Sequence, residues 1–416
     1  MKNKPDGLFF NRQFCAEAQN CCDRRGEITY VISPRGLSIK RFGMEEKMKK
    51  KLQEIFEWFH RNPELSYEEY RTTQQIRRIL EEAGVEILPL SLETGLVAVI
   101  RGKKEGPVQA LRCDIDALPI LEESGLSYAS ETPGRMHACG HDFHITAGIG
   151  AALRLQERRE ELAGTVKILF QPGEESSLGA LKLLETDVCD DVERFWGLHA
   201  DPTNEAGVIG LRPGYVSAAV DRFLITIKGI GCHGAHPDDG ADPIPAACAV
   251  VQALQTIVTR NVNAFHPALI SVTRIEAGNT WNVIPETAEL EGTVRTMDRA
   301  DRKLFEEKLS LIAERTAQAY GAQAQVQWIP GPPAVVNDEK MAEYAADVAR
   351  RLGFVVVPEE QSLGGDDFSF YEEKAPGCYI KIGTGKGQLI HQPGFAVDES
   401  VLEPTAVYLT EVLMGD

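Results

Sequence analysis

The chain has 416 residues, of which 43% are hydrophobic and 25% charged, a composition typical of a globular protein large enough for two domains. Its formal net charge of −18 argues against nucleic acid or an anionic membrane as a partner. No apolar run approaches the roughly 18 residues needed to cross a bilayer, and the start of the chain has no signal-peptide core. Nine cysteines without paired spacing indicate a reducing compartment, so we expect a cytoplasmic protein.

Residues 1–43 differ in character from the rest of the chain. Cys15, Cys21 and Cys22 lie there among charged and polar residues that show little periodicity. They could form a small metal or redox site, but no CxxC pair or partner histidine accompanies them. We therefore expect residues 1–43 to be a disordered extension, and the folded part to begin at Met44.

The next part of the chain alternates helices with strands. Apolar residues at helical spacing begin at Met48, and Asn62-Pro63 ends this predicted helix. Ser66-x-x-Glu69 has the form of a capping box and predicts a second helix, which stops at Gly84. The alternation that follows predicts a mixed, largely parallel sheet with helices on both faces. Strands are expected at 96–100, 108–112, 166–170 and 195–198, and helices at 145–159 and 178–184.

The pattern changes after Tyr215 and later returns. Strands are expected at 223–228, 269–275 and 290–296, with helices at 244–258 and 298–320, an order typical of a small α+β domain of the βαββαβ kind. The first pattern resumes with a helix at 339–352, a strand at 377–382 and a helix at 402–414. The predicted fold class is therefore α/β. A discontinuous catalytic domain, 44–217 and 333–416, is interrupted by an inserted α+β domain, 218–332.

One stretch, His137-Ala138-Cys139-Gly140-His141-Asp142-Phe143-His144, contains a thiol, three imidazoles and a carboxylate. Nitrogen and sulfur ligands suit a borderline-soft divalent metal. We interpret Cys139 and His141 as ligands, although a lone buried cysteine is often inert. We interpret His137 and His144 as structural groups, because two more ligands from so short a turn would be crowded. Asp142 could bind the metal or cap the helix that begins there, and we favour capping.

Further candidate ligands lie near the ends of predicted strands, where α/β enzymes place their chemistry. His199 follows one strand, and His391 lies near the C-terminus. The pair Glu174-Glu175 follows another strand and could be only a solvated turn. Beside a metal, one carboxylate of such a pair could coordinate while the other accepts a proton from water.

Two more carboxylates, Asp114 and Asp116, end a further predicted strand. They could be metal ligands, or they could orient the ligand histidines through hydrogen bonds. We prefer the second interpretation for Asp116. The residues together predict a metal-dependent hydrolase.

Seven motifs, in this order, resemble those of the family of hippurate hydrolases, N-acyl-amino-acid amidohydrolases and auxin–amino-acid conjugate hydrolases. This family lies within the aminoacylase and carboxypeptidase-G metallopeptidase superfamily, and the similarity covers roughly residues 44–416. The motifs are Asp-x-Asp-Ala-Leu-Pro (114–119), Met-His-Ala-Cys-Gly-His-Asp (136–142), Gln-Pro-Gly-Glu-Glu (171–175), Gly-Leu-His (197–199), Gly-x-Gly-x-His (229–233), Asn-Val-Ile-Pro (282–285) and Gly-Thr-Val-Arg-Thr (292–296).

The resemblance implies a site for two divalent metal ions, which could be Zn, Mn, Co or Ni, with Glu174 as the general base. It also implies a homodimer or tetramer in which the inserted domain forms the dimer interface and His233 binds the oxyanion in the partner's active site. Asn282 and Arg295 stand where substrate-contacting residues are expected. The alternatives are that His233 only bonds nearby backbone and that Arg295 forms a strand-surface ion pair. The implied metal ligands are Cys139, His141, Glu175, His199 and His391.

Three motifs depart from the family pattern without removing a proposed ligand or the base. Phe143 stands in place of Gly, Gly234 follows His233 in place of Ala, and Gly364-Gly365-Asp366-Asp367-Phe368 replaces Gly-Ser-Glu-Asp-Phe. We expect a metal-activated water to cleave the amide bond of a small N-acyl amino acid or peptide. The alternatives are a hydrolase of amidine or imine C–N bonds and a non-catalytic metal- or ligand-binding protein on the same scaffold.

Overall fold

The computed structural model describes residues 39–415, and residues 48–416 form one compact unit. The expected extension lies outside the described residues, apart from residues 39–43, which begin helix α1 (Ile39–Arg61). The predicted end of this helix before Asn62-Pro63 is confirmed. Among the described helices, none has the length and apolarity needed to span a membrane.

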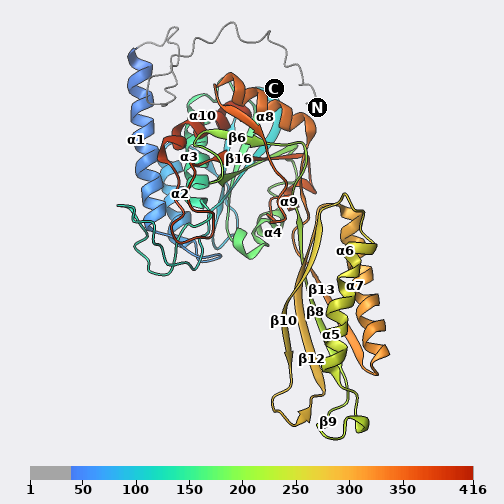
Figure 1. Cartoon of the computed structure of the whole chain (residues 1–416). Helices are drawn as coiled ribbons and strands as arrows, with labels where there is room; N and C mark the ends of the chain where they lie inside the picture. The colour runs from blue at the N-terminus through green and yellow to red at the C-terminus, as the bar shows by residue number, and fades with distance from the viewer. Residues whose placement is uncertain (1–38, 416) are drawn as a thin grey trace, which may run out of the picture. The chain divides into compact units, whose positions relative to one another are not determined.

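A mixed sheet of eight strands, in the order β1-β2-β4-β3-β5-β16-β6-β15, forms the centre of the compact unit (Figure 1). Strand β3 is parallel to both β4 and β5, and β16 is parallel to β5. The pairs β1–β2, β2–β4 and β16–β6 are antiparallel, so the predicted mixed sheet is confirmed. The strands are β1 (Glu86–Ile87), β2 (Leu96–Arg101), β3 (Lys104–Asp114), β4 (Ala163–Gln171), β5 (Arg194–Asp201), β6 (Val208–Leu211), β15 (Val355–Pro358) and β16 (Gly377–Gly383).

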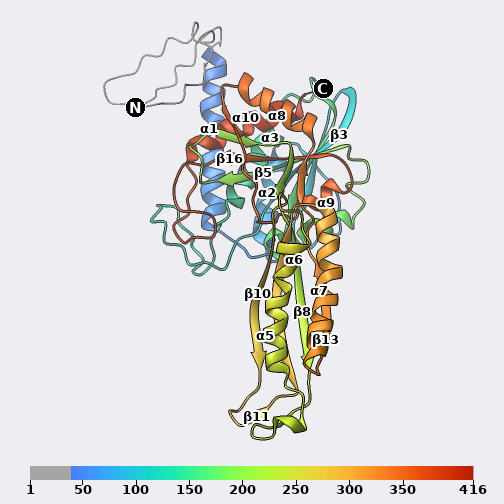
Figure 2. The same cartoon turned by 45° about the vertical axis from the view of Figure 1, so that its right-hand side comes forward.

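Helices cover both faces of this sheet, as Figure 2 also shows. Successive side chains of a strand point to opposite faces. In β2, Leu96 and Ala98 therefore join the core beneath α1, α2, α3, α8 and α10, whereas Val97 and Val99 join the core beneath α4 and α9. The additional helices are α2 (Tyr70–Glu82), α3 (His141–Glu157), α4 (Gly179–Leu184), α8 (Glu339–Arg351), α9 (Ser369–Glu372) and α10 (Leu402–Leu413).

A second, four-stranded antiparallel sheet, in the order β10-β12-β8-β13, is built from the segment that the sequence assigns to the inserted domain. Helices α5 and α7 cover one of its faces (Figures 1 and 2). Phe305, Leu309, Ala313 and Ala317 recur every four residues along α7, and all are buried in this core. The elements are β8 (Ala219–Lys228), β9 (Cys232–His233), α5 (Pro243–Leu254), α6 (Thr256–Arg260), β10 (Ala268–Ala277), β11 (Val283–Ile284), β12 (Thr287–Thr296), α7 (Arg299–Ala319) and β13 (Gln323–Pro330).

The chain enters and leaves this segment through a short antiparallel pair, β7 (Gly214–Ser217) with β14 (Val335–Asn337). The pairing brings the two ends of the segment together beside the larger sheet's strands. This topology favours the domain boundaries at 218 and 332, which stay a prediction.

Two local predictions were wrong. The expected capping box does not form, because the Ser66 hydroxyl donates to Asp116 and the backbone N–H groups of Arg71 and Thr72 donate to Glu64 instead. Helix α3 begins at His141, four residues before its expected start. Almost every residue of α3 is buried, so no amphipathic period marks where it begins.

Candidate metal centre and active site

Parallel strand ends bring the candidate residues together. Strands β3, β4 and β5 run in one direction, so the chain leaves them at the same edge of the sheet. Asp114 is the last residue of β3, and Glu174 and Glu175 form a 3₁₀ turn just after β4. His199 lies near the end of β5, and the first turn of α3 supplies His141.

The Cys139 thiol lies at the middle of the candidate ligands. Its sulfur is 3.4 Å from Nε2 of His199 and 3.3 Å from Nε2 of His391. Oε1 of Glu175 is 3.3 Å from the same nitrogen of His391. Two groups of atoms that could hold a metal ion therefore share this thiol: Cys139 with His141 and His199, and Cys139 with Glu175 and His391.

Hydrogen bonds fix the histidine tautomers in the form that a metal requires. Nδ1 of His141 lies 2.8 Å from the carbonyl oxygen of Asp116, and Nδ1 of His199 lies 2.6 Å from that of Ala200. A carbonyl only accepts, so both Nδ1 atoms carry a hydrogen, and in the neutral ring that a metal binds Nε2 keeps the lone pair. Nε2 of His141 is buried and has no hydrogen-bond partner within the described part of the chain. Such an orphaned atom fits a metal ligand.

His144 and Asp114 have other partners. Nδ1 of His144 donates to Oδ1 of Asp114, and Nε2 of His144 accepts the N–H of Ala200 at 2.8 Å. The other oxygen of Asp114 accepts from Arg112. Burial opposes ionisation of Asp114, but Arg112 and the two neighbouring histidines hold its pKa well below the usual range. This geometry favours a structural role for His144 and an orienting role for Asp114.

Asp116 anchors the glutamate turn. Its Oδ1 accepts the N–H of Glu174 at 3.1 Å, and its Oδ2 accepts the N–H of Glu175 at 3.0 Å. Burial opposes its ionisation, but hydrogen bonds from His141, Ser66 and the turn lower its pKa. Asp116 therefore orients His141 and also the two glutamates, a contact that the sequence analysis did not anticipate.

Glu174 occupies an acidic and largely buried position. Its side chain is 13% exposed, and its Oε2 lies 4.0 Å from Nε2 of His141. Burial, with the charges of Asp366, Asp367 and Glu175, raises the pKa of Glu174 well above its usual value. A carboxylate with a raised pKa can accept a proton near neutral pH and pass it on.

Arg112 is a site residue to which the sequence analysis gave no role. Its guanidinium is fully buried and pairs with Asp114, with Asp366 at 3.2 Å and with Asp367 at 2.6 Å, while Nε donates to Gln171. An arginine that directly follows the apolar pair Ala110-Leu111, two residues before Asp114, was the available signal. The loop containing Asp366 and Asp367 thus directs both side chains at Arg112.

His60, at the end of α1, was also missed. Its Nδ1 lies 2.6 Å from Asp142, and its Nε2 lies 3.1 Å from Glu122. Asp142 is therefore not the N-cap that we expected, because Gly140 precedes the helix with φ +84° and Asp142 sits inside the first turn.

Two further residues of the same stretch, Phe143 and His137, are buried. Phe143 points into the core, away from solvent. His137 has neither ring nitrogen hydrogen-bonded among the described residues.

The three remaining predicted residues lie in the segment of the four-stranded sheet. His233 is exposed, its Nδ1 accepts the N–H of Ala235 at 3.1 Å, and it pairs with Val283 across β9 and β11. Asn282 is its neighbour, because the carbonyl of Asn282 accepts the N–H of Gly234. Arg295 is half-buried on β12 and donates to Thr293. The structure thus brings His233 beside Asn282, and His233 belongs to neither of the two groups that share the Cys139 thiol.

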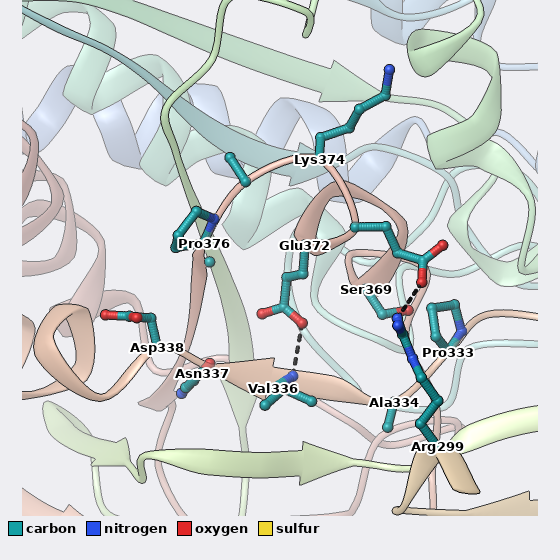
Figure 3. A pocket seen from close by; sticks show the side chains of 13 residues that line it. Arg299, Pro333, Ala334, Val336, Asn337, Asp338, Ser369, Glu372, Lys374 and Pro376 are labelled. Atoms are coloured by element: carbon teal, nitrogen blue, oxygen red, sulfur yellow. Dashed lines mark hydrogen bonds and ion pairs between the residues drawn. The ribbon is translucent and has the colours of Figure 1, made fainter. Parts of the chain in front are cut away.

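A separate cavity of about 460 Å³ is lined by residues of β14, α9 and the start of α7 (Figure 3). Glu372 accepts the N–H of Val336 there at 2.7 Å, and Arg299 pairs with Glu373 at its rim. None of the predicted site residues lines this cavity. Its lining gives no reason to place the reaction there.

Comparisons with known proteins support the metal centre. A model of peptidase family M20/M25/M40 matches residues 110–415. The N-acetylcysteine deacetylase of Bacillus subtilis (strain 168) is 46% identical over 354 residues, covering 85% of this chain and 93% of the relative. The IAA-amino acid hydrolase ILR1-like 4 of Arabidopsis thaliana is 34% identical over 398 residues, which are 90% of each chain.

Solved structures agree with these relatives. The crystal structure of the Bacillus subtilis YXEP protein, described as a dinuclear metal binding peptidase from the M20 family, is 43% identical with a TM-score of 0.81. It covers 89% of this chain and 98% of that one. The predicted family, the α/β fold and the expectation of a hydrolase are confirmed. This chain belongs to peptidase family M20/M25/M40.

Proposed function

We propose that this protein hydrolyses the amide bond of small N-acyl amino acids and that it uses two divalent metal ions. The single observation that carries the proposal is the shared Cys139 thiol, which belongs both to the group with His141 and His199 and to the group with Glu175 and His391. The names of the deacetylase and conjugate-hydrolase relatives support an N-acyl amino acid as the substrate class.

The five residues fit two ions of the borderline-soft kind. They offer one sulfur, three imidazole nitrogens and one carboxylate oxygen, a donor set that suits Zn, Mn, Co or Ni. The lone pairs of His141 and His199 are already held toward the thiol by hydrogen bonds on the opposite ring nitrogens. When bound, the ions would polarise the substrate carbonyl and lower the pKa of water.

The protein's own groups would then move the proton. Glu174 accepts a proton from the attacking water and returns it to the nitrogen of the departing amino acid, so the amine leaves neutral. Asp116 holds the backbone of Glu174 and Glu175 while this happens. His233 donates a hydrogen bond to the oxyanion of the partner's site, and Asn282 and Arg295 contact the substrate there.

This arrangement requires a homodimer, for which the inserted segment is our candidate interface. Phe265 and Trp281 are each 94% exposed in that segment, and exposed aromatic side chains often mark contact surfaces. We also propose a cytoplasmic location. The six cysteines within the described residues are all free, as expected in a reducing compartment.

The test is a substrate panel measured with each metal in turn. The purified full chain would be stripped with a chelator, reloaded with Mn²⁺, Co²⁺, Ni²⁺ or Zn²⁺, and assayed for release of free amine. N-acetyl and N-benzoyl amino acids, N-acetylcysteine among them, dipeptides and an amidine make up the panel. We expect turnover of N-acyl amino acids that disappears in the chelated protein and returns with metal. Cleavage of the amidine alone would favour the rival C–N hydrolase, and no turnover with any metal would overturn the proposal.

A further inference from the structure

A short segment near the start of the compact unit holds the turn that carries both glutamates. The segment is Ser66–Glu69, between α1 and α2, and the turn is Gly173–Ser176. Glu69 accepts the N–H of Gly173 at 2.8 Å across 104 residues of sequence. Ser66 donates at 2.7 Å to Asp116, the carboxylate that accepts both glutamate N–H groups.

Tyr67 makes the most specific of these contacts. Its ring packs closely against Gly173, since a Cβ at that glycine would be 2.5 Å from Cε1 of the ring. Its hydroxyl lies 2.7 Å from the hydroxyl of Ser176, which itself donates to the carbonyl of Gly173 at 2.6 Å. The Tyr67 hydroxyl is therefore the donor in the first bond. Ring and hydroxyl together hold the turn at both ends.

The backbone of Tyr67 is strained in a way that this contact explains. Its φ is +65°, in the left-handed region that residues other than glycine rarely adopt. A strained backbone conformation of this kind persists only where the surrounding contacts fix it, and it is frequent at active sites. Gly173 faces the ring with φ +66°, so the two chain segments meet through two left-handed residues.

We infer that Tyr67 is a positioning residue that fixes Glu174 and Glu175 through Ser176 and Gly173. The inference rests on the function proposed for those two glutamates. The contacts that carry this inference are those of Tyr67 with Ser176 and Gly173, so it acts on the two glutamates through the turn. It also lines a groove of about 940 Å³ with residues such as Leu90 and Leu178, which gives it an alternative role as a wall of the substrate site.

Five variants of the full chain separate these roles. Tyr67→Phe and Ser176→Ala each remove one hydroxyl of the bonded pair, and Tyr67→Phe/Ser176→Ala removes both. Ser176→Thr keeps the hydroxyl, and Tyr70→Phe changes a tyrosine that is 55% exposed at the start of α2. For each variant we would measure kcat and KM on an N-acyl amino acid, and Co²⁺ affinity from the visible absorption of the titrated protein.

We expect Tyr67→Phe and Ser176→Ala each to lower kcat or Co²⁺ affinity by roughly tenfold, as seen for other bonds that orient metal ligands. KM should stay within about twofold, and the double variant should lose no more than Ser176→Ala alone, since Ser176→Ala already removes the bond to Tyr67. Ser176→Thr and Tyr70→Phe should behave like the wild type.

Two results would overturn the inference. One is wild-type kcat and Co²⁺ affinity in both Tyr67→Phe and Ser176→Ala. The other is a raised KM with unchanged kcat in Tyr67→Phe, which would place the hydroxyl on the substrate. If the wild type hydrolyses no N-acyl amino acid, the proposed function fails, and Co²⁺ affinity alone then decides the role of Tyr67.

Discussion

The imidazole of His60 lies 2.6 Å from the carboxylate of Asp142, and both side chains are buried. Asp142 follows His141 in the chain, so this contact ties the end of α1 to the first turn of α3. The other ring nitrogen of His60 faces Glu122 at 3.1 Å. This buried imidazole between two carboxylates is therefore hydrogen-bonded to the residue that follows a candidate metal ligand.

We expect the His60 interaction to make stability depend on pH. Burial lowers the pKa of His60, but Asp142 and Glu122 outweigh it and raise the pKa from 6.5 to about 9. The protonated form therefore stabilises the folded chain fully below about pH 6.5, and this contribution is lost as the pH rises through 9. His60→Leu should cost on the order of 3 kcal/mol at pH 6 and much less at pH 9.5. Urea unfolding of the wild type and His60→Leu at both pH values measures the loss of stability. An equal loss at pH 6 and pH 9.5 would contradict the prediction.

Glu174→Gln should abolish most turnover without disturbing the metals. The amide keeps the shape of the side chain but cannot take a proton, and a general base contributes about 10²–10⁴-fold to kcat. Metal analysis and kcat measured on the same preparation provide the check. The adjacent Glu175→Gln is the matched control, because it should lose metal as well. Near wild-type kcat in fully loaded Glu174→Gln would refute the assignment.

Cys139→Ser should lower the metal content of the purified protein from two ions per chain toward one or none. The sulfur belongs to both candidate ligand groups, and a thiolate is a strong ligand that a hydroxyl does not replace. Elemental analysis gives the stoichiometry. Cys248→Ser changes an exposed cysteine and should keep both ions. Two ions retained by Cys139→Ser would exclude the thiol as an essential ligand.

Arg112→Met should destabilise the protein by about 3–5 kcal/mol, because it leaves buried carboxylates without their partner. Asp114 and Asp367 are completely buried, and Asp366 nearly so. Arg101→Met, on strand β2 of the same sheet, is the control. Its ion pair with Glu86 is 58% and 49% exposed, so its loss should cost less than about 1 kcal/mol. Denaturant unfolding of both variants measures how much unfolding free energy each one loses. Equal losses in the two variants would contradict the prediction.

Mixing two inactive variants tests whether His233 acts in the partner's site. His233→Ala and Glu174→Gln subunits are combined and allowed to exchange. If the histidine acts across the dimer, one site of each mixed dimer carries both defects and the other carries neither, so activity should return. If it acts within its own chain, every site keeps one defect. Absence of rescue, with exchange confirmed by mass spectrometry of the mixed dimers, would defeat the hypothesis.

The long elements were predictable from sequence, whereas the short strands were not. Strands such as β5 and β12 have apolar runs or alternation long enough to recognise, but β1, β6 and β15 have only two to four residues each. Their assignment depends on pairing with distant strands. The order of the eight strands, with β16 between β5 and β6, likewise has no local signal.

The candidate site likewise contains some residues that were predictable from sequence and others that were not. Cys139 and His141 are two residues apart, so their chemistry could be read directly. His199 and His391 lie 60 and 252 residues from Cys139, and only the fold brings them to the thiol. Arg112 could not be given a role, because its partner Asp367 is 255 residues away. The capping box failed because Ser66 found a distant acceptor, a tertiary contact that overrode a local preference.

The place of β16 in the large sheet has a consequence for the order of folding during synthesis. The four-stranded sheet is contiguous in sequence, so it can close as soon as residues 219–330 have left the ribosome. The large sheet cannot, because β5 and β6 are joined only through β16, the last strand to be made. Until then, β5 has an open edge near His199, which exposes the nascent chain to mispairing. We expect ribosome-bound chains that end before Gly377 to protect the small sheet from proteolysis and to leave β5 and β6 cleavable; early protection of β5 and β6 would argue against this order.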